Sequence, residues 1–266
     1  MSSNNSTQRT AIQQFMAFTQ CSERTATKFL KSFSWNVEAA ADSYFNAPNT
    51  HPSSSAGPSG RGDLNKIFEQ FREPTDAPDT FGVNGSMRFL QSIDVGLEES
   101  TVLVIAELLN APTMGEFSRQ GFITGWTSLG CDSLDKMRAI VPALRHSLHA
   151  DETTFKRVYM FTFAFARTQG QKSLPLEVAI EYWKLLLGKR FEALFPTWIE
   201  FLENEYKRTI SKDTWNCMYD FVQLAQKDPD LATYDVDGAW PSILDDFVRY
   251  WREKTGREVR SEEAEE

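Results

Sequence analysis

From Asp63 onward, apolar residues recur at intervals of three and four positions, a spacing that predicts amphipathic α-helices. Asp63 is expected to cap the first of these helices, and Pro241 to open the last. Alternation with a period of two residues, which would indicate strands, is absent. We therefore predict an all-α domain of about ten helices over residues 63–254, followed by a charged tail at 255–266. Examples of the apolar faces are Leu64, Ile67, Phe68 and Phe71, and Ile243, Leu244, Phe247, Val248 and Trp251.

The first segment, residues 8–46, has the same helical spacing in three shorter stretches. Their apolar positions are Ile12, Phe15, Met16 and Phe18; Ala26, Phe29 and Leu30; and Val37, Ala40, Ala41, Tyr44 and Phe45. Three short helices with small alanine faces and a closing aromatic pair resemble a ubiquitin-associated (UBA-like) module. That resemblance implies weak ubiquitin contacts at Phe18, Thr19 and Phe45. The Met-Gly-aromatic loop usual in such modules is replaced here by Phe18-Thr19-Gln20-Cys21, so an interaction module without ubiquitin binding is the alternative.

Residues 47–62 separate the two segments and are rich in Pro, Gly and Ser. They lack apolar side chains large enough to form a core. We interpret them as a flexible linker between the UBA-like domain and the larger helical domain.

The charge of the chain narrows its partners. The formal net charge is −9 and basic residues are scattered singly, so a nucleic-acid partner is not expected. Between Asp213 and Asp246 there are eight aspartates and one lysine, Lys227. Such a field suits a basic protein surface, because opposite charges steer an encounter and suppress wrong partners. A merely solvated acidic face is the alternative.

Targeting signals are not apparent in the sequence. It contains no secretory signal and no run of about 18 apolar residues, so no membrane association is expected. The three cysteines, Cys21, Cys131 and Cys217, are odd in number and widely spaced, which indicates a reducing compartment. We expect a cytoplasmic or nuclear protein, or one found in both.

Metal binding is not expected, although the chain contains a loop frame of EF-hand length. Residues 110–121 place Gly115 at position 6 of 12, but positions 1, 3, 5 and 12 require oxygen ligands. Those positions hold Asn110, Pro112, Met114 and Gly121. A second frame with Gly82 at position 6 has Arg88 at position 12. Neither frame predicts a calcium site.

Catalytic chemistry is also not expected. Cys131 precedes a predicted helix but has no nearby histidine, and His146 and His149 lack further ligands to complete a zinc site. The chain has no Cys-x-x-Cys pair, no Walker loop and no dinucleotide fingerprint. We predict a protein without cofactor that performs no bond chemistry itself.

Several motifs of the larger domain resemble the DCN-like (defective in cullin neddylation) family. They are Gly130-Cys131-Asp132-Ser133-Leu134, Phe161-Thr162-Phe163-Ala164-Phe165-Ala166, Lys212-Asp213-Thr214-Trp215-Asn216, Asp237-Gly238-Ala239-Trp240-Pro241 and Ile243-Leu244-Asp245-Asp246-Phe247-Val248. The resemblance covers nearly the whole chain, including the UBA-like module and the linker.

This resemblance implies a scaffold-type co-ligase for neddylation. Its partners would be the C-terminal winged-helix region of a cullin and the N-acetylated neddylation conjugating enzyme, with ubiquitin as a third candidate. Such a protein stimulates transfer of the ubiquitin-like modifier to a cullin lysine. Its helical domain, the PONY (potentiating neddylation) domain, contains degenerate EF-hand-like folds. The rival interpretation is a ubiquitin-binding adaptor that acts through the UBA-like module.

The resemblance assigns the cullin-binding patch to Asp213, Ala239 and Asp245. Two carboxylates flanking a small residue would let a basic or aromatic side chain approach closely. Each acid also has a local interpretation: Asp213 is a candidate helix cap, and Asp245 a candidate i,i+4 ion pair with Arg249.

The resemblance also implies a hydrophobic slot for the acetylated N-terminal methionine of the conjugating enzyme. An apolar pocket suits a methionine side chain, and acetylation removes the charge that burial would penalise. From the sequence alone, these positions read as ordinary helical core. Ser86 departs from the pattern, because a more apolar lining residue is expected there. The matching positions are Val102, Ile105, Ala106, Met114, Gly115, Phe117, Phe165 and Leu185.

Overall fold

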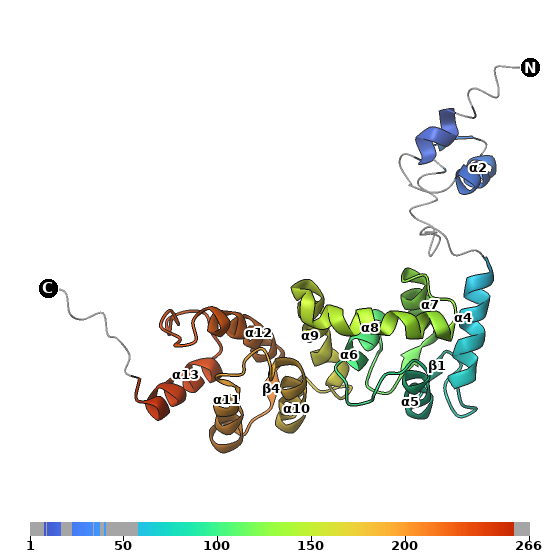
Figure 1. The fold of residues 1–266 in the computed structure, drawn as a ribbon. Helices are drawn as coiled ribbons and strands as arrows, with labels where there is room; N and C mark the ends of the chain where they lie inside the picture. Colours follow the sequence, from blue (N-terminus) through green and yellow to red (C-terminus); the bar gives the residue numbers. More distant parts are fainter. Residues whose placement is uncertain are drawn as a thin grey trace, which may run out of the picture. The chain divides into compact units, whose positions relative to one another are not determined.

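The computed structural model describes residues 8, 10–16, 23–33, 35–37, 40 and 58–257. The chain divides into a small N-terminal unit and a larger unit that begins at Leu64. Both are helical, so the predicted all-α fold class is confirmed (Figure 1).

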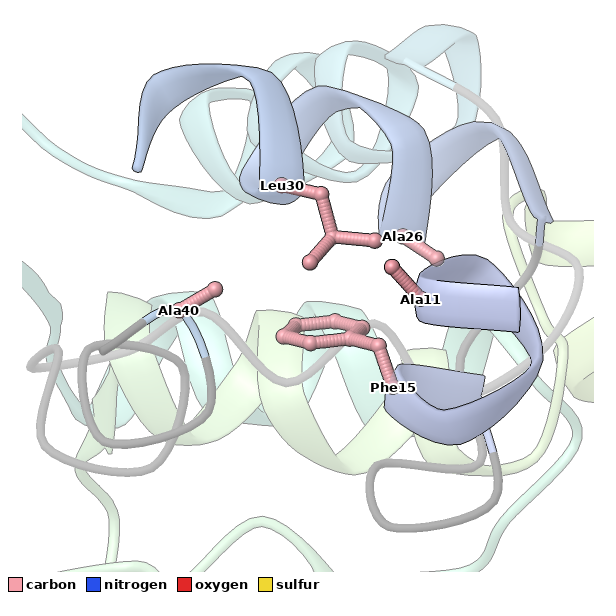
Figure 2. Packing of buried hydrophobic residues seen from close by; sticks show 5 residues of the cluster. All are labelled: Ala11, Phe15, Ala26, Leu30 and Ala40. Carbon is pink, nitrogen blue, oxygen red and sulfur yellow. The ribbon is translucent and has the colours of Figure 1, made fainter. Parts of the chain in front are cut away.

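The small unit is built around a cluster of five buried apolar residues (Figure 2). Phe15 lies at its centre, fully buried, and Ala26 and Leu30 face it from α2 (Glu23–Ser32). The alanines leave room for the Phe15 ring, because their side chains add no bulk beyond Cβ. The helical spacing in the sequence predicts four of these five residues, but not Ala11. The three candidate ubiquitin-binding positions lie outside the described residues. The cluster consists of Ala11, Phe15, Ala26, Leu30 and Ala40.

Ten α-helices lie within residues 58–257, and the first of them crosses the boundary between the two units at Leu64 (Figure 1). The first five are α4 (Pro58–Phe71), α5 (Val83–Ser92), α6 (Thr101–Leu108), α7 (Arg119–Ser128) and α8 (Leu134–Ala150). The other five are α9 (Glu152–Ala166), α10 (Leu176–Leu187), α11 (Phe195–Phe201), α12 (Lys212–Lys227) and α13 (Ser242–Thr255). A short π-helix, η1 (Leu202–Tyr206), continues α11.

Two very short antiparallel sheets join the loops between the helices. β1 (Thr80–Phe81) pairs with β2 (Phe117–Ser118), linking the α4–α5 loop to the α6–α7 loop. β3 (Ser173–Leu174) pairs with β4 (Ile210–Ser211) and links the α9–α10 loop to the segment before α12. Paired helix-loop-helix units of this kind have the EF-hand-like form. Strands of two residues are too short to produce an alternating pattern, so the sequence did not predict them.

Arginines bridge the loops of the first pair. Arg88, at position 12 of the degenerate frame, donates to Glu73 at 2.8 Å and to the Phe71 carbonyl at 3.1 Å. Arg119 contacts Asp79 at 2.9 Å and also pairs with Glu69. These guanidinium groups tie the loops to α4. Among the described residues, no group of three or more His, Cys, Asp or Glu side chains could hold a metal ion.

Aromatic rings fill the core beneath the first pair. The Phe81 ring lies 4.9 Å from Phe68, 5.4 Å from Phe117 and 5.9 Å from Phe122, centroid to centroid. At Gly121, a Cβ atom would collide with the carbonyl oxygen of Leu109. The close approach of α7 to the end of α6 therefore requires glycine at this position.

Two helix starts differ from the expectation. The first helix of the larger unit begins at Pro58, five residues before Asp63, because proline has a backbone φ that suits the first helical turn. Pro241 is the N-cap of α13, which begins at Ser242, rather than its first helical residue. Of the helices that the structure describes, none is long and apolar enough to cross a bilayer.

Candidate functional site

The first of the three candidate cullin-binding residues, Asp213, lies in the opening turn of α12. The N-cap of that helix is Ser211, whose hydroxyl accepts from the Thr214 amide at 3.0 Å. The expectation that Asp213 is the cap is therefore wrong: Ser211 already has the extended backbone and the side-chain bond of a cap. The Asp213 side chain is exposed, and its charge suits the positive end of the helix dipole.

Trp215 anchors the same turn to α9. The Tyr159 hydroxyl donates to the Trp215 carbonyl at 2.8 Å, and the Trp215 indole donates to the Tyr159 carbonyl at 3.0 Å. The Trp215 ring stacks on Tyr159 at 4.8 Å and on Trp183 at 5.3 Å. All three rings are fully buried. The backbone is therefore held in place at Trp215, two residues after Asp213.

The loop between α12 and α13 is stabilised by its own hydrogen bonds. The Asp228 carboxylate accepts from the amide of Thr233 at 2.6 Å and from its hydroxyl at 2.7 Å. These bonds lower the pKa of Asp228. Leu231, buried and with a left-handed φ of 48°, offers its carbonyl to Arg252 of α13 at 3.0 Å. The loop therefore has a defined shape against α13.

Ala239 is exposed at the end of this loop, beside a packed aromatic group. The adjacent Trp240 stacks on Tyr234 with centroids 5.6 Å apart and an interplanar angle of 22°. Phe221 of α12 meets Tyr234 edge-on at 5.8 Å and Trp240 at 6.1 Å. These contacts fix the backbone on the C-terminal side of Ala239.

Asp245 is half-buried in the first turn of α13. Its Oδ1 atom accepts a hydrogen bond of 2.7 Å from the Tyr234 hydroxyl. The expected i,i+4 pair with Arg249 is wrong, because Arg249 forms its ion pair with Asp246, at i,i+3. Asp245 thus has a hydroxyl partner instead of a cation.

The three patch residues belong to one unit but are not equally close. Ala239 and Asp245 share a scaffold through Tyr234 and Trp240. Asp213 precedes Phe221, the α12 residue in that scaffold, by eight positions, or about 12 Å along a helix. Asp213, Asp220 and Asp237 have no side-chain partner among the described residues, whereas the other five acids of the stretch make ion pairs or hydrogen bonds.

Two further features describe the surroundings of the patch. Burial raises the pKa of the Cys217 thiol, and the negative charges of Asp213 and Asp220 raise it further. Both carboxylates therefore lie on the face of α12 that carries Cys217. A pocket of about 540 Å³ opens beside Asp245. Its lining is mixed, with apolar and arginine side chains: Val236, Asp245, Val248, Arg249, Arg252, Glu253, Gly256 and Arg257.

The eight candidate slot positions are spread over α6, the β2 region, α9 and α10. Ile105, Ala106, Phe117 and Phe165 are buried, and Val102 and Gly115 are half-buried. α6 packs against α9, which carries Phe165 near its end. Met114 and Leu185 are instead 56% and 40% exposed. Four positions are thus core, and two present apolar side chains to solvent. The exposed pair is Met114 and Leu185.

Ser86 has a structural role in this region. It is buried, and its hydroxyl donates to the Gly115 carbonyl at 2.9 Å, so burial leaves no unpaired polar group. Gly115 has φ +79°, and a Cβ atom there would meet Val83. Val83 is itself 58% exposed. Serine at position 86 therefore fixes the Gly115 turn beside exposed Val83 and Met114.

Of the candidate catalytic residues, Cys131 has an environment that disfavours reactivity. Burial raises the pKa of Cys131, which keeps its thiol protonated and weakly nucleophilic. His146 and His149 are exposed on α8. Cys21 lies outside the described residues.

Sequence reasoning missed Tyr234, because its partner Asp245 lies eleven residues away and in another element.

Two family models match this chain, and several known proteins are similar to it. A family model described as "Cullin binding" matches residues 136–250, which include the three patch positions, and one described as "UBA-like domain" matches residues 9–50. Defective in cullin neddylation protein 1 of Yarrowia lipolytica is 36% identical, covering 91% of this chain and 96% of that protein. The protein of the same name from Caenorhabditis elegans is 34% identical over 93% and 91%. DCN1-like protein 4 of Homo sapiens is 39% identical over 71% and 63%.

Proposed function

This chain belongs to the family of defective in cullin neddylation proteins, and from that membership we propose that it is a scaffold-type co-ligase. It binds the C-terminal winged-helix region of a cullin and, at the same time, the neddylation conjugating enzyme that carries the ubiquitin-like modifier. It thereby stimulates transfer of the ubiquitin-like modifier to a cullin lysine. No residue of this chain takes part in the chemistry.

The observation that carries the proposal is the rigid acidic patch inside the "Cullin binding" match. Exposed Asp213 and half-buried Asp245 offer carboxylates on backbones held by Trp215 and by Tyr234. Ala239 is small and exposed, so it leaves space for a partner side chain. The Asp245 carboxylate, already oriented by Tyr234, loses less conformational entropy on binding, and the negative charges of both acids favour a basic surface.

The second contact of the scaffold is the apolar region of α6, β2 and α9. In this proposal, buried Ile105 and Phe165 form an apolar floor, and exposed Met114 forms a flexible rim. Such a site suits an acetylated N-terminal methionine, because burying a charged amine would be costly. We expect a peptide from the conjugating enzyme to bind more tightly when acetylated than as the free amine. Equal affinities in isothermal titration calorimetry would contradict the slot.

Proximity and orientation explain the stimulation. Tyr159, which holds the turn of Asp213, and Phe165 lie on the same helix, six residues or about 9 Å apart along its axis. A single helix therefore connects the supports of the two proposed docking surfaces. Rigid spacing between two bound partners raises the frequency of productive encounters without a catalytic group.

A reconstituted neddylation assay tests the proposal. Asp245→Lys reverses a charge on the patch and should abolish both cullin pull-down and stimulation, while Ala239→Arg should block the space by bulk. Glu98→Lys is the matched control, because Glu98 is an exposed acid in the α5–α6 loop. Wild-type cullin binding by both patch variants would refute the assignment.

The UBA-like match over residues 9–50 favours one second candidate function, a ubiquitin-binding adaptor. Isothermal titration calorimetry of ubiquitin with the full chain distinguishes the two functions. The adaptor function requires appreciable binding that persists in Asp245→Lys.

A further inference from the structure

Tyr234 contacts both Asp245 and Trp240, the residue next to Ala239. It is only 5% exposed, although it lies in a surface loop. Its hydroxyl donates to Asp245 Oδ1 at 2.7 Å, and its ring stacks on Trp240. The hydrogen bond spans eleven residues and joins the loop to the first turn of α13.

The position of that hydroxyl is itself well determined. The Tyr234 ring is held between Trp240, stacked on it, and Phe221, which meets it edge-on at 5.8 Å. The preceding residue, Thr233, is bonded twice to the Asp228 carboxylate. A ring fixed on these sides holds the hydroxyl oxygen within hydrogen-bonding distance of Asp245.

Asp245 depends on this donor for its orientation. Arg249, the cation expected beside it, pairs with Asp246 instead. With Oδ1 held by Tyr234, the second carboxylate oxygen is left to meet a partner. Without the hydroxyl, the half-exposed carboxylate could rotate among rotamers, and binding would have to restore the order.

We propose that Tyr234 is a positioning residue for cullin binding: its hydroxyl holds the Asp245 carboxylate, and its ring holds Trp240 and thereby Ala239, in the geometry that the partner's basic surface meets. This inference rests on the proposed function of the patch. Tyr234 contributes through Asp245 and Ala239 and need not contact the cullin itself.

The protonation state of Tyr234 agrees with this role. Burial, together with the hydrogen bond to Asp245, raises the pKa of the Tyr234 hydroxyl well above its usual range. The hydroxyl therefore stays protonated, and remains a donor, at physiological pH.

Tyr234→Phe is the sharpest test, because it removes the hydroxyl and keeps the ring. Affinity of the full chain for a purified cullin C-terminal region should fall by about fivefold to tenfold, as expected when binding must immobilise one additional side chain, that of Asp245. The matched control is Tyr250→Phe. Tyr250 also donates to a carboxylate, Glu200 at 2.9 Å, but lies about 140° around α13 from Asp245. The affinity of the Tyr250→Phe variant for the cullin region should equal that of the wild type.

A double-mutant cycle separates positioning from a general structural role. In an Asp245→Ala background, at low ionic strength where weak binding stays measurable, Tyr234→Phe should cause less than about a twofold further loss. A merely structural role would produce the same loss in both backgrounds. An undiminished loss in the Asp245→Ala background would overturn the proposal, whatever the stability of the variant.

The remaining outcomes distinguish this inference from the proposed function. If Asp245→Lys abolishes cullin binding and Tyr234→Phe binds like wild type, the patch stands and the positioning role is wrong. If Asp245→Lys itself binds normally, the patch assignment fails and the positioning role fails with it.

Discussion

Tyr159 connects two other buried aromatic residues of the larger unit, Trp183 and Trp215, and removal of its hydroxyl tests that arrangement. Tyr159→Phe keeps the ring stacked on Trp215. It deletes the O–H that donates to the Trp215 carbonyl at 2.8 Å and that accepts from the Trp183 indole N–H at 3.0 Å. All three side chains are fully buried, so water does not replace the lost partner without rearrangement.

The expected magnitude follows from these two bonds. The Trp215 carbonyl lies within α12 and keeps access to an intrahelical N–H, so losing the hydroxyl there costs about 1 kcal/mol. The Trp183 N–H is left buried without a partner, which costs roughly 1–3 kcal/mol more. We therefore expect the free energy of unfolding to fall by about 3 kcal/mol, equivalent to a Tm lower by about 6–12 °C for a unit of this size.

Urea unfolding followed by tryptophan fluorescence measures this loss. Six of the seven tryptophans, all except Trp35, belong to the larger unit, so the signal reports mainly on it. Tyr206→Phe is the control, because that hydroxyl donates to the Thr209 carbonyl at 3.3 Å in a more exposed setting. It should cost less than about 1 kcal/mol. A Tyr159→Phe variant within about 0.5 kcal/mol of wild type would refute the reasoning about buried polar groups.

Three more predictions concern single sites. Gly121→Ala should lower the Tm in calorimetry, because its methyl group would collide with the Leu109 carbonyl and force α7 away from α6; an unchanged Tm would contradict that close approach. Asp151 caps α9, and its hydrogen bonds lower its pKa below the ordinary 3.8, so the stability it provides is present above pH 3.8 and lost as the pH falls through the lowered value. Asp151→Ala should therefore be less stable than wild type at pH 7, with the difference vanishing in acid unfolding curves. Cys217 should be alkylated slowly by iodoacetamide at pH 8, since its pKa is raised, and Asp220→Asn should increase the rate; equal rates would show that the carboxylate does not act on the thiol.

The helices of this protein could be predicted from local patterns, and their limits only approximately. The spacing of apolar residues depends on neighbours three and four positions apart, so it was sufficient for the helical core of both units. Helix starts depend on caps and backbone angles, which compete over a few residues. Asp63 and Asp213 are both good capping residues, yet Pro58 begins α4 and Ser211 caps α12.

The candidate site also combines features that the sequence predicts with features that only the fold decides. The acidic composition and the small size of Ala239 can be predicted from the sequence, because charge and size are properties of the residue itself. The hydrogen-bond or ion-pair partner of each acid cannot be predicted in this way, since Arg249 lies within reach of both Asp245 and Asp246 along one helix. Only the packed loop brings Tyr234 to Asp245 and leaves Arg249 to its neighbour.

By itself, the sequence determined that this chain is helical and that it is acidic over one stretch. Those properties follow from residue types and short-range spacing. The tertiary structure alone decided which groups hold the acidic patch in place. Tyr159 and Trp215 are 56 residues apart, and Tyr234 meets Asp245 from another element. Such contacts depend on how the helices pack, because no local pattern records which distant side chain will fill a given space.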